Sequence, residues 1–147
     1  MEKPFIEENR RERQRLQALV GRITDEELKI PMWRGWTIAT VLAHLAFWDQ
    51  RALVLMRKWK ETRVAPSPID QDVANEALLP LLNAIPPRTA ANLAVSAAEG
   101  IDLELETASD HLIDDMAKLG DRFRLYRSDH RKIHLDQIDS RLYNDIA

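Results

Sequence analysis

The stretch that decides the fold is Gly35-Trp-Thr-Ile-Ala-Thr-Val-Leu-Ala-His-Leu-Ala-Phe-Trp-Asp49. Thr37 belongs to a residue type that caps helices, and the apolar residues after it recur at helical spacing. We therefore predict a long helix from Thr37 to about Thr62, ended by the prolines at 66 and 68. His44 stands among apolar and aromatic residues of this helix, so we expect its imidazole to be buried.

Further helices are predicted on both sides of this stretch. A first helix is expected from about Phe5 to about Gly21, and Thr24 and Glu27 form a capping box that starts a short helical turn. After the prolines, the expected helices cover residues 69–84, with an interruption or kink at Pro80, then 88–108 and 125–142. Residues 109–124 are ambiguous, because Ser109 could cap a short helix through Leu119 that Gly120 closes.

The number of long helices sets the fold class. Four long helices, one long connection and short extra helices predict an all-α four-helix bundle. A chain of 147 residues is long enough to bury a core of its own, so residues 1–147 are expected to form a single domain.

The composition excludes several classes of protein. Lys and Arg number 21 against 24 Asp and Glu, giving a net charge of −3 without a basic block, so nucleic acid is not an expected partner. The absence of cysteine excludes disulfides, thiolate metal ligands and a cysteine nucleophile. Neither a signal peptide nor an apolar run of membrane-spanning length is expected, which predicts a soluble cytoplasmic protein without a membrane partner.

The last predicted helix carries two histidines four residues apart. This spacing places His130 and His134 on one face of the helix. On spacing alone, a solvated or hydrogen-bonded pair is the commoner outcome. If this face packs against the helix that holds His44, three neutral nitrogen ligands converge and leave a coordination position of a divalent metal open, as in catalytic sites.

Two other kinds of metal site do not fit these histidines. A zincin protease needs a glutamate directly after its first histidine, where this chain has Arg131. A di-iron bundle needs glutamates three residues before its histidines, and the residues at those places are Val41, Arg127 and Arg131.

Side chains near the histidines are candidates for the rest of a site. We expect Phe47 and Trp48 to form an apolar wall, and Gln137 to hydrogen-bond a substrate or a water on the metal. Arg51 or Arg141 would then pair with an anionic group of the substrate. The alternative is that the aromatic residues are ordinary core and that the arginines end in solvent.

Three further residues are weaker candidates for the site. Asp49 and Asp136 could orient a ligand imidazole, although Asp49 is expected to face solvent or a loop. His111 lies in an acidic turn and is expected to be exposed rather than a fourth ligand.

The run from Gly35 to Asp49, followed about 80 residues later by a helical His-x-x-x-His, resembles the DinB-like four-helix-bundle superfamily. The resemblance covers most of the chain. It implies a divalent metal held by one histidine of the second long helix and two of the last, which are His44, His130 and His134. The superfamily includes the N-terminal domain of mycothiol-dependent maleylpyruvate isomerase and several thiol-dependent transferases.

These observations lead to a functional hypothesis. Zinc or nickel on the three histidines would lower the pKa of a bound thiol or water, a mechanism that needs no protein nucleophile. The resemblance implies a thiol-dependent transferase or isomerase that acts on a small electrophile, with a low-molecular-weight thiol as cosubstrate. The alternatives are a metal-dependent hydrolase and a non-catalytic, metal-binding stress-response module. A homodimer formed through an apolar helix face is also expected.

Overall fold

The computed structural model describes residues 2–144, which form helices and their connections. Apart from one isolated bridge between Pro31 and Thr37, the described residues contain no β-structure. The elements in chain order are α1 (Pro4–Arg22), α2 (Asp25–Leu28), α3 (Ile38–Glu61), α4 (Gln71–Asn83), α5 (Pro87–Thr107), α6 (Asp110–Ala117), the 3-10 turn η1 (Gly120–Arg122), α7 (Ser128–Asp139) and the π-helical turn η2 (Ser140–Asn144).

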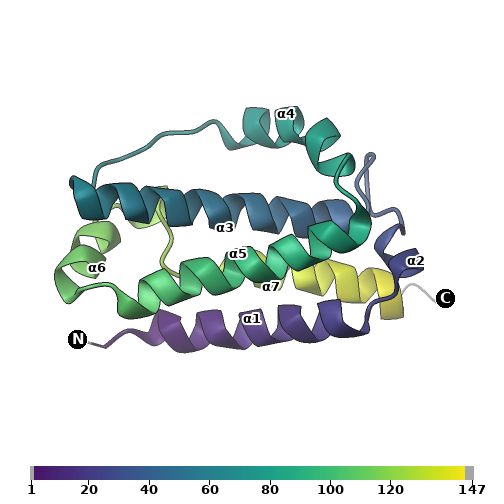
Figure 1. Cartoon of the computed structure of the whole chain (residues 1–147), viewed down its shortest axis with the longest axis horizontal. Helices are drawn as coiled ribbons and strands as arrows, with labels where there is room; N and C mark the ends of the chain where they lie inside the picture. Colours follow the sequence, from purple (N-terminus) through teal and green to yellow (C-terminus); the bar gives the residue numbers. More distant parts are fainter. Residues whose placement is uncertain (1, 145–147) are drawn as a thin grey trace.

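The helices α1, α3, α5 and α7 form a four-helix bundle (Figure 1). Helix α5 contacts both α1 and α3, and α7 packs against the other sides of α1 and α3. The connection 62–70 carries the chain back along α3 to α4, which packs on the outside of α3. The predicted all-α bundle, with its long connection and short extra helices, is confirmed.

Helix starts follow the predicted capping residues. The Thr37 hydroxyl accepts a hydrogen bond from the Thr40 backbone nitrogen at 3.1 Å, and the Thr40 hydroxyl accepts one from the Thr37 backbone nitrogen at 3.2 Å. Ser109 caps α6 by accepting from the Leu112 backbone nitrogen at 3.1 Å. These bonds satisfy amide groups that have no partner within the helix.

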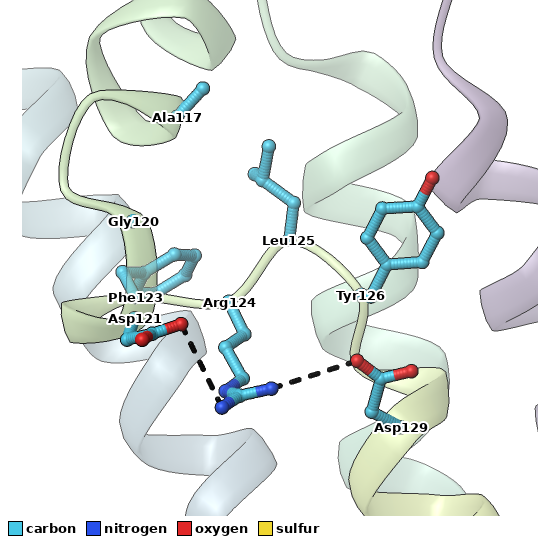
Figure 2. Close-up of a pocket in the computed structure, with 8 residues that line it drawn as sticks. All are labelled: Ala117, Gly120, Asp121, Phe123, Arg124, Leu125, Tyr126 and Asp129. Carbon is cyan, nitrogen blue, oxygen red and sulfur yellow. Dashed lines mark ion pairs between the residues drawn. The ribbon is translucent and has the colours of Figure 1, made fainter.

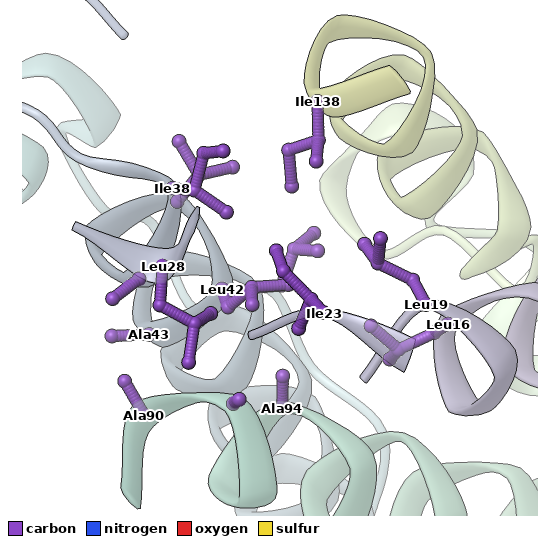
Figure 3. Packing of buried hydrophobic residues seen from close by; sticks show 14 of the residues in the cluster. Leu16, Leu19, Ile23, Leu28, Ile38, Leu42, Ala43, Ala90, Ala94 and Ile138 are labelled. Carbon is purple, nitrogen blue, oxygen red and sulfur yellow. The ribbon is translucent and has the colours of Figure 1, made fainter. Parts of the chain in front are cut away.

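The interior contains two groups of buried apolar residues. The first core cluster fills the end of the bundle near α2 and the end of α7 (Figure 3); its members include Leu16, Leu19, Ile23, Leu28, Ile38, Leu42, Ala94, Leu135 and Ile138. The second core cluster fills the end near α6; its members include Phe5, Leu53, Met56, Trp59, Ile101, Leu105, Met116 and Phe123.

Helix α7 differs from its predicted bounds at both ends. It begins at Ser128 rather than near Leu125, because Asn9 of α1 holds the preceding segment in a non-helical course. The Asn9 amide donates to the Leu125 carbonyl at 2.9 Å, and its oxygen accepts from the Ser128 backbone nitrogen at 2.8 Å. After Asp139 the chain continues as the π-helical turn η2, where an α-helix to Leu142 was expected.

Two other expectations need revision. Helix α4 continues through Pro80 to Asn83 without interruption, so of the two predicted effects of this proline only a kink stays a prediction. Helix α3 has the length and hydropathy of a membrane span, contrary to the expectation that no run of this kind exists. In the structure, 67% of that apolar window is buried inside the bundle. A helix enclosed on most sides by its neighbours is apolar around most of its circumference, and this burial is compatible with a soluble protein.

Candidate metal centre

Three histidines from two helices meet at one point of the bundle. His44 lies on α3, and His130 and His134 lie one turn apart on the face of α7 that packs against α3. The Nε2 atom of His130 lies 3.0 Å from Nε2 of His44 and 3.1 Å from Nε2 of His134. His44 is buried and the other two side chains are partly buried. The structure thus brings together the three residues that the sequence proposed as ligands.

The contacts of His130 are suited to a cation. A neutral imidazole nitrogen carries either one proton or one lone pair, so the single Nε2 atom of His130 cannot form a well-directed hydrogen bond with both neighbours. A metal ion placed among the three nitrogens would accept a lone pair from each. The ligand atoms of the group all lie within 4.8 Å of one another, which is close enough for one ion to bind all three.

Burial keeps these imidazoles in the neutral form that ligates metals. It lowers the pKa of His44 to about 4, with a smaller contribution from the nearby His134. Burial likewise lowers the pKa of His130 to about 2, helped by the neighbouring histidines and by Arg127 and Arg131. The pKa of His134 is lowered by burial and raised in part by its hydrogen bond to Gln137. At neutral pH the lone pairs are therefore available to a metal.

The outer nitrogens of the histidines differ in their surroundings. Nδ1 of His134 lies 2.8 Å from the amide oxygen of Gln137, a contact in which the imidazole donates and leaves Nε2 free to ligate. Nδ1 of His44 is buried and has no hydrogen-bond partner among the described residues. His134 is thus held in the ligating tautomer by the side chain of Gln137, whereas no described residue plays this part at Nδ1 of His44.

Two tryptophans cover the histidines. In the turn after Pro31, the Trp36 backbone nitrogen donates to the Trp33 carbonyl at 2.6 Å, and Arg34 and Gly35 both have positive φ angles of 37° and 84°. The turn stacks Trp33 on Trp36, with ring centroids 5.8 Å apart. Trp33 also stacks on His134, and the ring of Trp36 meets that of His44 edge to face. The sequence predicts a packed loop here but gives no indication that it covers the site.

A hollow of about 390 Å³ lies next to Trp33 and Gln137, and none of the three histidines lines it. Gln137 and Trp33, which both touch His134, form part of its wall. Its other lining residues are Met32, Asp136, Ser140 and Arg141. The Arg141 side chain donates through Nε to the Pro31 carbonyl at 3.1 Å, which joins η2 to the tryptophan turn. Gln137 and Arg141 both line this hollow, and their roles toward a substrate stay predictions.

Other residues proposed for the site lie elsewhere. The Trp48 indole donates to Asn75 of α4 at 2.9 Å. Neither Trp48 nor Phe47 lines the hollow. Arg51 donates to the Ser67 carbonyl at 2.7 Å, and its guanidinium lies over the Trp48 ring, 5.9 Å from the ring centre. Arg51 thus fixes the connection 62–70 in the structure, and its role toward a substrate stays a prediction.

Asp49 and Asp136, which could in principle orient a ligand imidazole, pair with arginine and lysine side chains instead. Asp49 was expected to face solvent or a loop, but its side chain is buried and pairs with Arg127 at 3.0 Å and Arg131 at 3.1 Å. Asp136 is exposed and pairs with Arg15 and Lys132. In the sequence, a buried carboxylate that pairs with two guanidinium groups cannot be told from an exposed carboxylate. The expectation that Asp49 faces solvent or a loop is wrong for this reason.

A second hollow and the fourth histidine lie outside this centre. The hollow, of about 240 Å³, lies between α6 and α7, where Arg124 pairs with Asp121 at 3.8 Å and Asp129 at 3.7 Å (Figure 2). His111 of α6 is exposed, 3.4 Å from Asp115, and is not part of the histidine group. Neither adds a ligand to the centre.

Comparison with known proteins agrees with this architecture. The family model described as the DinB superfamily matches residues 8–137, a range that includes all three histidines. No curated protein and no solved structure matches the chain. Because the match covers most of the sequence and the histidines meet as a possible metal site in an all-α bundle, the chain belongs to the metal-binding DinB superfamily.

Proposed function

We propose that this protein is a divalent-metal-dependent enzyme in which His44, His130 and His134 hold zinc or nickel. The observation that carries the proposal is the convergence of their Nε2 atoms, with separations of 3.0 and 3.1 Å at His130. A hydrogen-bonded cluster of this kind leaves one nitrogen poorly satisfied, whereas a shared cation satisfies all three. The hollow lined by Trp33 and Gln137, the two residues that contact His134, would supply space for a small molecule.

The reaction we propose is transfer of a low-molecular-weight thiol to a small electrophile, or a thiol-dependent isomerisation. The metal, when bound, supplies Lewis acidity that lowers the pKa of a thiol or a water. The chain has no cysteine of its own, so the nucleophilic sulfur would come from a cosubstrate.

The residues around the centre have separate roles in this proposal. Gln137 holds His134 in the ligating tautomer through their 2.8 Å contact. Trp33 and Trp36 shield the imidazoles from water on one side. Arg141, at the edge of the hollow, would pair with an anionic group of the substrate.

The experiment that tests the proposal begins with metal analysis of protein purified without a histidine tag. The protein is stripped with a chelator, reloaded with zinc or nickel, and assayed for consumption of several small thiols in the presence of small electrophiles. We expect about one metal ion per chain and thiol consumption that requires the metal. His111→Ala serves as the matched control, because it removes a histidine outside the centre.

Two outcomes would favour the alternatives. Metal-dependent cleavage of esters or amides without thiol consumption would identify a hydrolase, in which water takes the place of the thiol. Stoichiometric metal without any turnover would identify a non-catalytic metal-binding module. Absence of bound metal in the wild type would overturn the proposal altogether.

A further inference from the structure

Five charged side chains form a layer across the middle of the bundle. The ionic layer consists of Arg13, Asp49, Asp102, Arg127 and Arg131. Along α1 and α3 this layer lies between the first and the second core cluster. Arg131, Asp102 and Asp49 belong to the interior, with exposed fractions of 0%, 1% and 3%. Arg13 and Arg127 are partly buried.

Arg131 connects all four bundle helices from α7. Its guanidinium donates to both carboxylate oxygens of Asp102 on α5 at 2.9 Å, and to Asp49 of α3 at 3.1 Å. It also donates to the Asn9 carbonyl of α1 at 3.1 Å. A planar guanidinium with five donors can make these directed bonds together, which a lysine ammonium cannot.

The cost of burying these charges indicates what the layer is for. Well-packed apolar residues often replace a buried ion pair without loss of stability, so stability alone does not account for this arrangement. Directed bonds in an interior instead select one alignment of helices over others, as polar residues do in coiled coils. An apolar seam would allow α7 to rotate or shift along its neighbours at little cost.

The alignment of α7 decides whether the histidines meet. Arg131 follows His130 directly and precedes His134 by three residues, so a rotation of α7 moves all three side chains together. His44 approaches them from α3, the helix to which Arg131 is bonded through Asp49, five residues beyond His44. The anchor and the ligands therefore share the same two helices.

We infer that Arg131 is a positioning residue for the metal centre, which it aligns by fixing α7 against α3 and α5 through Asp49 and Asp102. The inference rests on the proposed function in so far as the centre binds metal. It concerns the geometry of the histidines, however, and can be measured in protein without metal.

The test uses the double variant Asp102→Leu/Arg131→Met, which removes a buried pair as a unit. Asp49 keeps Arg127, and Arg13 keeps Glu106, whose carboxylate lies 3.9 Å away. Met116→Ala is the matched control, because it leaves a cavity in the second core cluster, on the far side of the ionic layer. Zinc affinity is measured by competition with a chromophoric chelator, and stability by urea unfolding without metal.

We expect the double variant to unfold cooperatively and to bind zinc at least tenfold more weakly than the wild type. Met116→Ala should lose stability and keep the zinc affinity of the wild type. Arg131→Lys, which keeps the charge, should fold and show a smaller loss of affinity, and it provides the measurement if the double variant does not fold. The inference would be overturned if both Arg131 variants bound zinc as tightly as the wild type. It would also be overturned if Met116→Ala lost as much zinc affinity as the double variant.

A second measurement separates this inference from the proposed function. The rings of His44 and His130 have centroids 4.9 Å apart, so their protons should give a nuclear Overhauser effect in metal-free protein. We expect this signal to persist in Met116→Ala and to disappear in the double variant. If the wild type binds no zinc, the proposed function fails. The Overhauser signal still decides the role of Arg131, because a signal that persists in the double variant would refute the positioning role.

Discussion

His134 and Gln137, one turn apart on α7, are joined through the imidazole Nδ1 atom and the amide oxygen at 2.8 Å. The sequence predicts that Gln137 contacts a substrate or a water. In the structure its amide oxygen accepts a hydrogen bond from His134, a candidate metal ligand. Partners of this kind fix the tautomer and orientation of a ligating histidine, and losing them weakens metal binding by about 10- to 100-fold.

Gln137→Leu is therefore expected to weaken zinc binding by about that factor, because the His134 ring loses its acceptor. Gln137→Glu keeps an acceptor and should bind zinc at least as tightly as the wild type. Competition titrations with a chelator measure both affinities. Equal zinc affinity in Gln137→Leu and the wild type would show that the contact does not orient a ligand.

The three candidate ligands should each be necessary for metal binding. His44→Ala, His130→Ala and His134→Ala leave two protein ligands, too few for a tight site, whereas His111→Ala leaves all three. Free zinc at 100 times its dissociation constant should stabilise the wild type by about 2.7 kcal/mol. For a chain of this size, that corresponds to a rise in melting temperature of roughly 5 to 10 °C.

Calorimetric scans with and without zinc measure this rise. We expect it in the wild type and in His111→Ala, and its absence in the other three variants. A His130→Ala protein that still binds one equivalent as tightly as the wild type would refute the site.

Metal binding should survive in mildly acidic solution. Burial lowers the pKa of His44 to about 4, so between pH 6.5 and about 4 this imidazole stays neutral in the folded chain and remains able to ligate. Because the pKa of each of the three imidazoles is lowered, we expect bound zinc to be lost below the ordinary histidine pKa of about 6.5. Dialysis at a series of pH values followed by metal analysis measures the midpoint.

The same lowered pKa makes the metal-free protein sensitive to acid. In the unfolded chain His44 takes up a proton below about pH 6.5, but in the folded chain it does so only near pH 4. The unfolded state thus binds more protons in this window, and stability falls as the pH falls through it. His44→Gln, which does not titrate, should show a smaller fall in melting temperature; an identical fall would contradict the lowered pKa.

The tryptophan turn contains a conformational strain that can be relieved. Arg34 has a φ of 37°, in the left-handed region, which costs a residue with a Cβ atom roughly 1 kcal/mol. Arg34→Asn is expected to stabilise the protein by up to about this amount, because Asn followed by Gly is the preferred pair in such a turn. Gly35→Ala should destabilise it, since Gly35 has a φ of 84°.

Urea unfolding measures both changes. Zinc affinity provides the control, because Arg34→Asn leaves Trp33 and Trp36 in place and should not change it. A loss of stability in Arg34→Asn would indicate that the Arg34 side chain makes a contribution that outweighs the strain.

The features that could be predicted from the sequence are those that depend on neighbouring residues. Thr37, Thr24 and Ser109 cap helices as expected, and the spacing of His130 and His134 predicts their common face. The contacts of Asn9 could not be predicted, because they join residues more than 100 positions apart. They are also the reason why α7 begins three residues later than its helical periodicity indicates.

The environment of the candidate site was harder to predict than its ligands. Asp49 and Arg131 have the pattern of exposed charges in the sequence, and only the packed bundle shows that they neutralise each other inside it. Trp33 and Trp36 lie in a loop whose course depends on an arginine in an unusual conformation. Sequence spacing gives the face of a helix, but not what another segment places over it.

The position of the ionic layer between two apolar clusters has a consequence for how the protein opens. Each cluster joins its own ends of α1, α3 and α5, so the two halves can loosen as separate cooperative units. Backbone amides around Met116 and Phe123 would then exchange their hydrogens with solvent at a rate independent of those around Leu42 and Ile138. Such a division would let the half near α6 change during evolution, in sequence or in mobility, while the histidines keep their mutual arrangement.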